Sequence, residues 1–164
     1  MKPAVGVLLQ AVLAGDLNRA QKLLEQGASA NEPDPETGGT VLHAALDCDH
    51  PDAMVKLLLD HTANVDATNK LGITPVMYAA KSCTEALRFM LKKNPDLRKK
   101  DLMDRDALTW AKNAFNPSAA ALIEDGLKLQ LEQAKFADFH QMALDNQAAL
   151  RKRRVKTILM AGPR

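Results

Sequence analysis

Aromatic residues are scarce in this 164-residue chain, which contains four Phe, one Tyr and one Trp. A β-sheet core depends on aromatic and β-branched residues, whereas the abundant Ala and Leu of this chain suit close packing of helix on helix. The composition therefore favours an all-α fold. With 46% apolar residues, the chain is long enough for one continuous core or a short stack of repeated units. Two independent domains would be cramped.

Cysteine is nearly absent, since the sequence has only Cys48 and Cys83. A disulfide framework or a zinc site needs more cysteines, or paired histidines near them. Two isolated thiols are typical of a reduced protein in the cytosol. We therefore expect a cytoplasmic protein.

Long apolar runs are also missing, because none reaches the roughly 18 residues of a membrane-spanning helix. Residues 4–14 resemble the apolar part of a short signal peptide, with Val12 and Ala14 at a cleavage site. Gln10 interrupts that run, and cleavage would remove a helix that the repeats described below require. We expect neither a membrane span nor a cleaved leader.

Charge is distributed unevenly along the chain. Residues 151–164 hold six of the 22 basic residues and none of the 20 acidic ones, so residues 1–150 carry a net −4. Such a run can be a nuclear-localisation signal, a patch for nucleic acid or another polyanion, a dock for an acidic partner, or merely solvated charge. No aromatic side chains interleave it to stack on bases, so nucleic-acid binding is the minor hypothesis. The candidate residues of this tail are Arg151, Lys152, Arg153, Arg154 and Lys156.

An internal repeat is the most informative feature of the sequence. When the chain is aligned with itself, Ala11, Ala45, Ala79 and Ala111 fall at intervals of 34, 34 and 32 residues. Each alanine is followed by a second apolar helical pattern that returns at the same interval. Similarity at a fixed period indicates stacked structural units.

The repeated motif resembles that of the ankyrin repeat family. Residues 38–45 read Gly-Gly-Thr-Val-Leu-His-Ala-Ala and residues 72–80 read Gly-Ile-Thr-Pro-Val-Met-Tyr-Ala-Ala, which match the opening of the family's unit. Residues 23–31 and 58–66 match its closing turn. The resemblance implies an all-α stack of helix-turn-helix units, at about 5–37, 38–71, 72–103 and 104–126, within a domain at 1–126. It also implies binding to a protein partner.

The chemistry of the motif explains its spacing. Thr40 and Thr74 are placed to cap a helix, and Pro75 suits a first helical turn. Gly27 lies where the chain leaves a second helix and needs a left-handed backbone, so Asn94 is tolerable at that place but Thr62 is not. Thr62 is therefore a predicted weak point.

No catalytic centre is apparent in the sequence. The resemblance implies that His43 is buried or half-buried and holds neighbouring loops by hydrogen bonds, and no nucleophile lies near it in sequence. The acid-rich run 47–52, with Cys48 and His50, lacks the glycine and terminal Glu of a calcium loop and the spacing of a zinc pair. There is no glycine-rich phosphate loop. We expect a non-enzymatic protein without a metal or cofactor.

Residues after Gly126, which we interpret as a helix stop, predict another helix at 127–150. Leu129, Phe136 and Phe139 fall near one face of it. This helix either packs on the open end of the stack beside Trp110 or captures or pairs with a partner. The basic tail, 151–164, is expected to fray.

Partners of proteins that look like this bind along the turn tips and the exposed side of the first helices. Apolar residues at tips that are usually polar favour a contact site, although they could also fold under a loop or under the C-terminal helix. Lysine and arginine beside them would suit a partner of mixed apolar and acidic character. The predicted partner-binding residues are Lys70, Leu71, Ile73, Lys81, Leu102, Met103 and Arg105.

Overall fold

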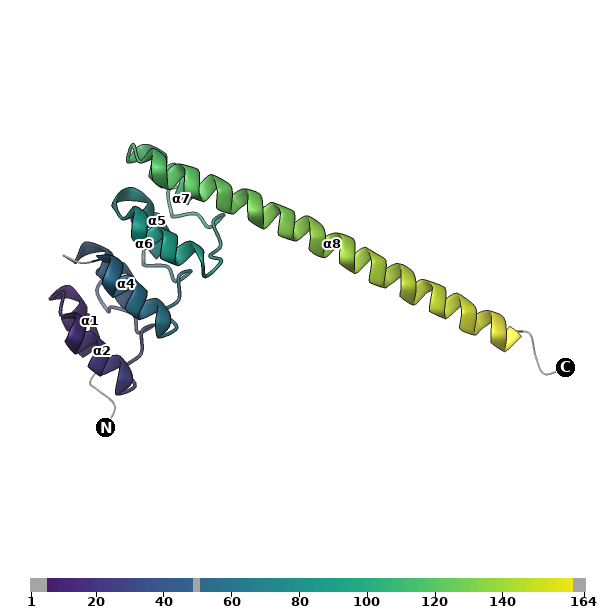
Figure 1. The fold of residues 1–164 in the computed structure, drawn as a ribbon, viewed down its shortest axis with the longest axis horizontal. Helices are drawn as coiled ribbons and strands as arrows, with labels where there is room; N and C mark the ends of the chain where they lie inside the picture. Colours follow the sequence, from purple (N-terminus) through teal and green to yellow (C-terminus); the bar gives the residue numbers. More distant parts are fainter. Residues whose placement is uncertain (1–5, 49–50, 161–164) are drawn as a thin grey trace. The chain divides into compact units, whose positions relative to one another are not determined.

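The chain forms helices joined by short loops (Figure 1). The structure, a computed structural model, describes residues 6–48 and 51–160, with side chains as far as Lys152. Within these ranges no β-strand forms, and a single bridge pairs Pro33 with Thr40. The expected all-α repeat stack is confirmed. Its elements are α1 (Val7–Leu13), α2 (Leu17–Glu25), α3 (Val41–Ala44), the 3-10 helix η1 (Ala45–Asp47), α4 (Pro51–Asp60), α5 (Pro75–Ser82), α6 (Thr84–Leu91), α7 (Ala107–Asn113) and α8 (Pro117–Met160).

The helices stack in two rows, as Figure 1 shows for the purple to green part of the chain. The first helices contact one another in the order α1, α3, α5 and α7, and the second helices follow as α2, α4 and α6. The recurring alanines lie in the first helices or, for Ala45, in η1 directly after α3, and are fully buried: Ala11, Ala45, Ala79 and Ala111 are each 0% exposed. A methyl side chain at this place lets neighbouring helices approach closely, which explains the period of the sequence.

Short polar side chains begin several of these helices. Asp16 accepts a hydrogen bond from the N–H of Arg19, and Asp106 accepts one from that of Thr109. Thr74 caps α5 by accepting the N–H of Met77 at 3.3 Å, and Pro75 is the first helical residue. The predicted cap at Thr74 is confirmed. Capping satisfies N–H groups that have no partner inside the helix.

A left-handed residue follows the end of each of the second helices α2, α4 and α6. Gly27 has φ 90°, Thr62 has φ 61° and Asn94 has φ 52°. Glycine adopts this conformation without steric cost and asparagine does so readily, whereas a β-branched residue is strained there. The sequence therefore identified the position and its misfit residue.

Replacing Thr62 with glycine should stabilise the protein. Relief of the left-handed strain, partly offset by the entropy of glycine, should raise the free energy of unfolding by about 1 kcal/mol. The hydrogen bond that the Thr62 carbonyl accepts from Asn31 uses the main chain and stays. Urea denaturation of Thr62→Gly and of the matched Asn94→Gly variant provides the measurement. An equal gain in both variants would contradict strain at Thr62.

The chain divides into two units, Met1–Gly126 and Leu127–Arg164. The predicted helix stop at Gly126 is wrong, because α8 continues through it from Pro117 to Met160. The glycine serves a close approach instead: a Cβ atom there would lie 2.9 Å from Cδ1 of the buried Leu97. The predicted bounds of 127–150 for this helix are also wrong, because α8 runs from Pro117 to Met160. The expected fraying from residue 151 is therefore wrong as far as Met160.

No helix in the described part of the chain is long and apolar enough to cross a membrane. Long apolar side chains do occur on α8, but charged residues separate them.

Candidate functional site

A loop precedes each first helix from the second unit onward, and an Asp or Asn side chain holds the tip of each loop. The Oδ1 atom of Asp34 accepts the N–H of Glu36 at 3.2 Å. Asn69 accepts the N–H groups of Leu71 and Ile73 in the same way, at 2.9 and 3.0 Å. Such turns fix the loop locally, because the side chain replaces a main-chain acceptor. Asp101 holds the third tip.

Successive tips are joined by main-chain hydrogen bonds. The N–H of Lys70 donates to the carbonyl of Thr37 at 2.9 Å, and that of Leu102 donates to the carbonyl of Leu71 at 3.0 Å. We call the three loops at 34–39, 69–73 and 101–105 the tip ladder. Because each tip is tied to the next, side chains from different repeats are held at fixed separations.

His43 connects two repeats below the tip ladder. Its Nδ1 accepts the N–H of Thr40 at 3.0 Å, which leaves Nε2 to donate to the carbonyl of Ile73, also at 3.0 Å. The side chain is buried, with 8% of the residue exposed. The expected structural role of His43 is confirmed. In the next repeat Met77 occupies the same place, and its sulfur lies 3.4 Å from the nitrogen of Thr74.

Burial lowers the pKa of His43, although its hydrogen bonds to Ile73 and Thr40 act in the opposite direction. A histidine whose pKa is lower in the folded than in the unfolded chain opposes protonation. Its contribution to stability is therefore present above about pH 6.5, the pKa of an unperturbed histidine, and is lost as the pH falls below that value.

The variant His43→Met should test this titration, since methionine already fills the equivalent place in the next repeat. At pH 7.5 the variant should be less stable by about 1–2 kcal/mol, because the buried carbonyl of Ile73 loses its donor. At pH 5.5 the difference from the wild type should shrink. Thermal unfolding of both proteins at both pH values measures it, and a constant difference would contradict the inference.

A groove lies between the first helices and the first two tips, with a volume of about 630 Å³. Among the described residues, none from the second helices lines it. Leu9 and Leu13 of α1, Asp47 of η1 and Tyr78 of α5 contribute to its floor and walls. The remaining lining residues are Asp34, Glu36, Thr37, Gly39, Thr40, His43, Ala44, Asn69, Lys70 and Leu71.

Aromatic rings continue from this groove along the first helices. Tyr78 meets His43 edge-on with the ring centroids 6.2 Å apart, and stacks on Trp110 with the centroids 6.1 Å apart. The guanidinium of Arg105 covers the other end of the row, 4.7 Å from the centroid of Trp110. Stacked rings give a rigid apolar surface that loses little entropy on binding.

Asp101 organises the end of the tip ladder. Its side chain is 2% exposed, accepts four hydrogen bonds and forms an ion pair with the guanidinium of Arg105. Oδ1 accepts the N–H groups of Met103 and Arg105, whereas Oδ2 accepts the guanidinium of Arg105 at 2.7 Å and the indole N–H of Trp110 at 3.0 Å. Burial alone would raise the pKa of Asp101, but these hydrogen bonds, first those from Arg105, lower it to about 2.

Three of the predicted partner-binding residues form an apolar patch on the tips. Leu71 is 59% exposed, Leu102 is 76% exposed and Met103 is 73% exposed. The hydrogen bond between the main chains of Leu71 and Leu102 keeps the two tips together. Ile73 is different: the prediction that it is exposed is wrong, because it is 5% exposed and its carbonyl bonds to His43.

The predicted basic contacts are mostly engaged within the protein. The ammonium of Lys70 donates to the carbonyls of Pro35 and Glu36, at 3.0 and 2.6 Å. Arg105 is paired with Asp101. Lys81 is exposed and lies with Arg105 and Trp110 at the edge of a small hollow of about 140 Å³.

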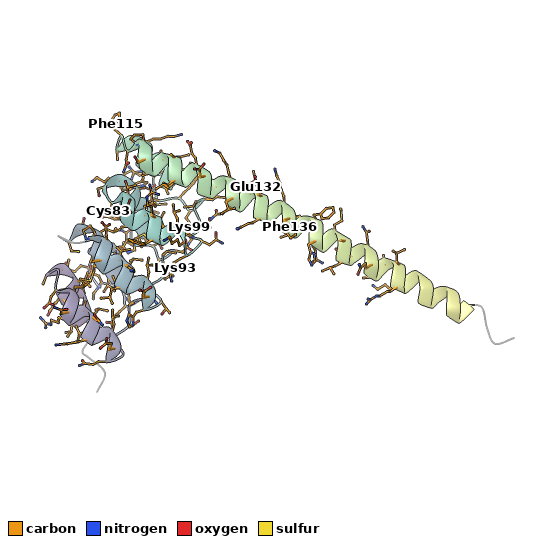
Figure 2. The ribbon with its side chains drawn as sticks, in the orientation of Figure 1. Cys83, Lys93, Lys99, Phe115, Glu132 and Phe136 are labelled. Carbon is orange, nitrogen blue, oxygen red and sulfur yellow. The ribbon has the colours of Figure 1, made fainter. Side chains whose placement is uncertain are left out.

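The second unit, Leu127–Arg164, contains most of α8 and the basic tail. Side chains such as Glu132 and Phe136 extend from it in Figure 2, and Phe136 is 73% exposed. Arg151 and Lys152 are exposed, whereas the side chains of Arg153, Arg154 and Lys156 lie outside the described part of the chain. Of the acid-rich run 47–52, residues 49 and 50 are likewise outside it. Among the described residues no three His, Cys, Asp or Glu side chains cluster as metal ligands would.

Known proteins share the repeat. The family described as ankyrin repeats (3 copies) matches residues 8–101, more than half of the chain. The chain is 33% identical to neurogenic locus notch homolog protein 1 of Xenopus tropicalis over 105 residues, which are 63% of the chain and 4% of the relative. The Mus musculus protein of that name is 32% identical over 118 residues, or 71% of the chain and 5% of the relative. The 2-5A-dependent ribonuclease of Mus musculus is 43% identical over 72 residues, or 44% of the chain and 10% of the relative.

The matched segment thus spans a tenth or less of each of these relatives. The matched range contains the helices from α2 to α6, the buried Ala11, Ala45 and Ala79, and the first two loops of the tip ladder. The chain belongs to the ankyrin repeat family.

Proposed function

We propose that this chain is a non-enzymatic binding module that holds a partner protein between its tip ladder and its first helices. The apolar patch of Leu71, Leu102 and Met103 supports the proposal most directly. Contiguous exposed apolar side chains mark contact surfaces, because their exposure to water has no benefit for the free monomer. The groove and the row of rings extend the same surface.

The rigidity of the tips adds to this argument. Binding costs less entropy when the contacting side chains are already fixed in place. Each tip is fixed by its own Asp or Asn side chain and by the main-chain hydrogen bond to the next tip. The apolar patch therefore meets a partner as a preformed surface.

The double variant Leu71→Asp and Leu102→Asp should capture partners at least tenfold less than the wild type, because two charges then face the apolar contact. Proximity labelling in cells that express the protein, followed by quantitative mass spectrometry, measures the loss. Leu17→Asp makes the same change at the start of α2, outside the groove, and should leave the captured set unchanged. Equal capture by the double variant would reject the patch as the binding site.

A second candidate function rests on the basic tail. Arg151 and Lys152 are exposed, and no acidic residue occurs in 151–164. Such a run attracts polyanions, so the tail could target the repeat stack to the nucleus or to nucleic acid. Removing residues 151–164 should then lower retention on heparin and change localisation, with no change in thermal unfolding. Unchanged retention and localisation would leave the tail without this role.

A further inference from the structure

The charge of the groove differs from that of the whole chain. Three carboxylates line it, from Asp34, Glu36 and Asp47, and one ammonium, from Lys70. The Asp34 carboxylate lies near Lys70 and is engaged in its own turn, where it accepts hydrogen bonds from Thr37 and Glu36. To a first approximation these two opposite charges cancel.

Glu36 and Asp47 supply the remaining charge. Both residues are exposed, and within the described part of the chain their carboxylates make no salt bridge. The charge of Lys70 is already counted against Asp34, and its ammonium donates to the carbonyl oxygens of Pro35 and Glu36 rather than to either carboxylate. The groove therefore carries a net charge of about −2 in water-accessible positions, and it attracts cations.

Apolar walls accompany this charge. Leu13 is 61% exposed and Leu71 is 59% exposed, and both line the groove together with the half-buried Leu9 and Tyr78. A volume of about 630 Å³ exceeds what one side chain needs, so the groove has room for a short piece of extended chain. An occupant must cover leucine side chains and offer positive charge to the carboxylates.

We propose that the groove receives a segment of a partner protein in which an arginine adjoins an aliphatic residue. The aliphatic side chain lies against Leu13 and Leu71, and the guanidinium faces Glu36 and Asp47. This inference rests on the proposed binding function and gives the chemical class of the partner. It differs from the expectation of a partner with mixed apolar and acidic character, which rested on Lys70, Lys81 and Arg105; Lys70 and Arg105 make hydrogen bonds within the protein.

Arginine fits this place better than lysine does. Its planar guanidinium binds a carboxylate through two hydrogen bonds and also stacks on an aromatic ring, whereas an ammonium is a more strongly hydrated point charge. Tyr78 offers such a ring among the residues that line the groove. An acidic segment would be repelled by the groove, and a purely aliphatic one would leave both carboxylates without a counter-charge.

Selection from a random dodecapeptide display library tests the proposal with the full chain as bait. Selected peptides should be enriched in arginine next to leucine, isoleucine or valine. A synthetic peptide of the consensus should bind at least tenfold more weakly to the double variant Glu36→Gln and Asp47→Asn. It should weaken similarly when its arginine becomes alanine, and less when it becomes lysine. Fluorescence polarisation measures these affinities.

The control carries the same loss of charge elsewhere. Glu25→Gln and Asp60→Asn change two exposed carboxylates at the ends of α2 and α4, and affinity should stay within twofold of the wild type. Enrichment of acidic peptides, or equal binding by the groove variant, would overturn the arginine inference. In either case, if the double variant Leu71→Asp and Leu102→Asp no longer binds the selected peptides, the binding function stands and only the arginine inference is rejected. A failure to enrich any peptide would count against both.

Discussion

Replacement of Asp101 by alanine should lower the free energy of unfolding by about 3 kcal/mol, because the half-buried guanidinium of Arg105 and several N–H groups then lose a buried carboxylate. The carboxylate receives four hydrogen bonds and an ion pair while its side chain is 2% exposed, so its removal leaves part-buried donors on Met103 and Trp110 without their acceptor. Arg105 would keep its charge over the ring of Trp110. Urea denaturation followed by circular dichroism measures the change.

The variant Asp101→Asn tests the roles of the two carboxylate oxygens separately. Asparagine already holds the preceding tip, where Asn69 accepts two main-chain N–H groups through its oxygen. The same two bonds can persist at position 101, whereas the ion pair with Arg105 is lost. We expect a loss of about 1.5–2.5 kcal/mol, smaller than that of Asp101→Ala, because hydrogen bonds to a charged group exceed neutral ones.

Acid should remove most of this difference. The pKa of Asp101 is about 2 in the folded protein against 3.8 for an unperturbed aspartate, so the folded state favours the ionised form. Its contribution of about 2 kcal/mol is complete above pH 3.8 and disappears as the pH falls towards 2. The stability curves of wild type and Asp101→Asn should therefore converge in that interval. Parallel curves from pH 5 to pH 2 would show that Asp101 does not titrate this way.

The sequence predicted the stack because its signals are local and repeated. Burial of a small side chain is required once in every unit, so Ala11, Ala45, Ala79 and Ala111 recur at nearly equal intervals and are all buried. The left-handed turn has a similarly local requirement, which is why Thr62 could be identified as a misfit before its φ of 61° was known. The structural role of His43 was predicted from its position in the repeat motif.

Several tertiary contacts could not be predicted in the same way. Lys70 and Arg105 appear as free cations in the sequence, yet Lys70 bonds to carbonyls about 35 residues away and Arg105 to a buried carboxylate. Ile73 follows the exposed Leu71 by two residues, but its carbonyl is the acceptor of His43. In the sequence Gly126 resembles a helix stop, but in the structure it allows a close approach to Leu97. Each of these contacts is created only by the folded chain.

A missed signal was nevertheless present in the sequence. Asp34, Asn69 and Asp101 precede the helix caps Thr40, Thr74 and Asp106 by six, five and five residues. A left-handed residue follows each of them within the tip: Gly38, Gly72 and Asp104, with φ 71°, 74° and 61°. Asp or Asn before such a residue is typical of a turn held by its side chain. A search for turns at the repeat interval would have located the tip ladder.

Substitution of Gly72 by alanine should destabilise the protein by about 2–3 kcal/mol, for two separate reasons. Its φ of 74° is unfavourable for any residue with a Cβ atom. In addition, the new Cβ would lie 3.2 Å from the Cα of Asp101 and 3.3 Å from the nitrogen of Leu102. These are main-chain atoms of the neighbouring tip, so they cannot move aside as a flexible side chain would.

Gly15→Ala isolates the first reason from the second. Gly15 has a similar φ of 67°, but a Cβ atom there would meet nothing within 4 Å. We expect a loss of about 1 kcal/mol for Gly15→Ala, from backbone conformation alone. The additional loss in Gly72→Ala then measures how tightly the two tips approach. Thermal and urea unfolding of the two variants, compared with the wild type, provide the values.

The same substitution should also impair binding through geometry, without changing a single contacting side chain. Displacement of Leu102 from Leu71 would break the hydrogen bond at 3.0 Å between the tips and split the apolar patch. Partner capture by Gly72→Ala should therefore fall well below that of Gly15→Ala, even at a temperature where both are folded. Equal stability and equal capture in the two variants would mean that the tips do not act as one preformed surface.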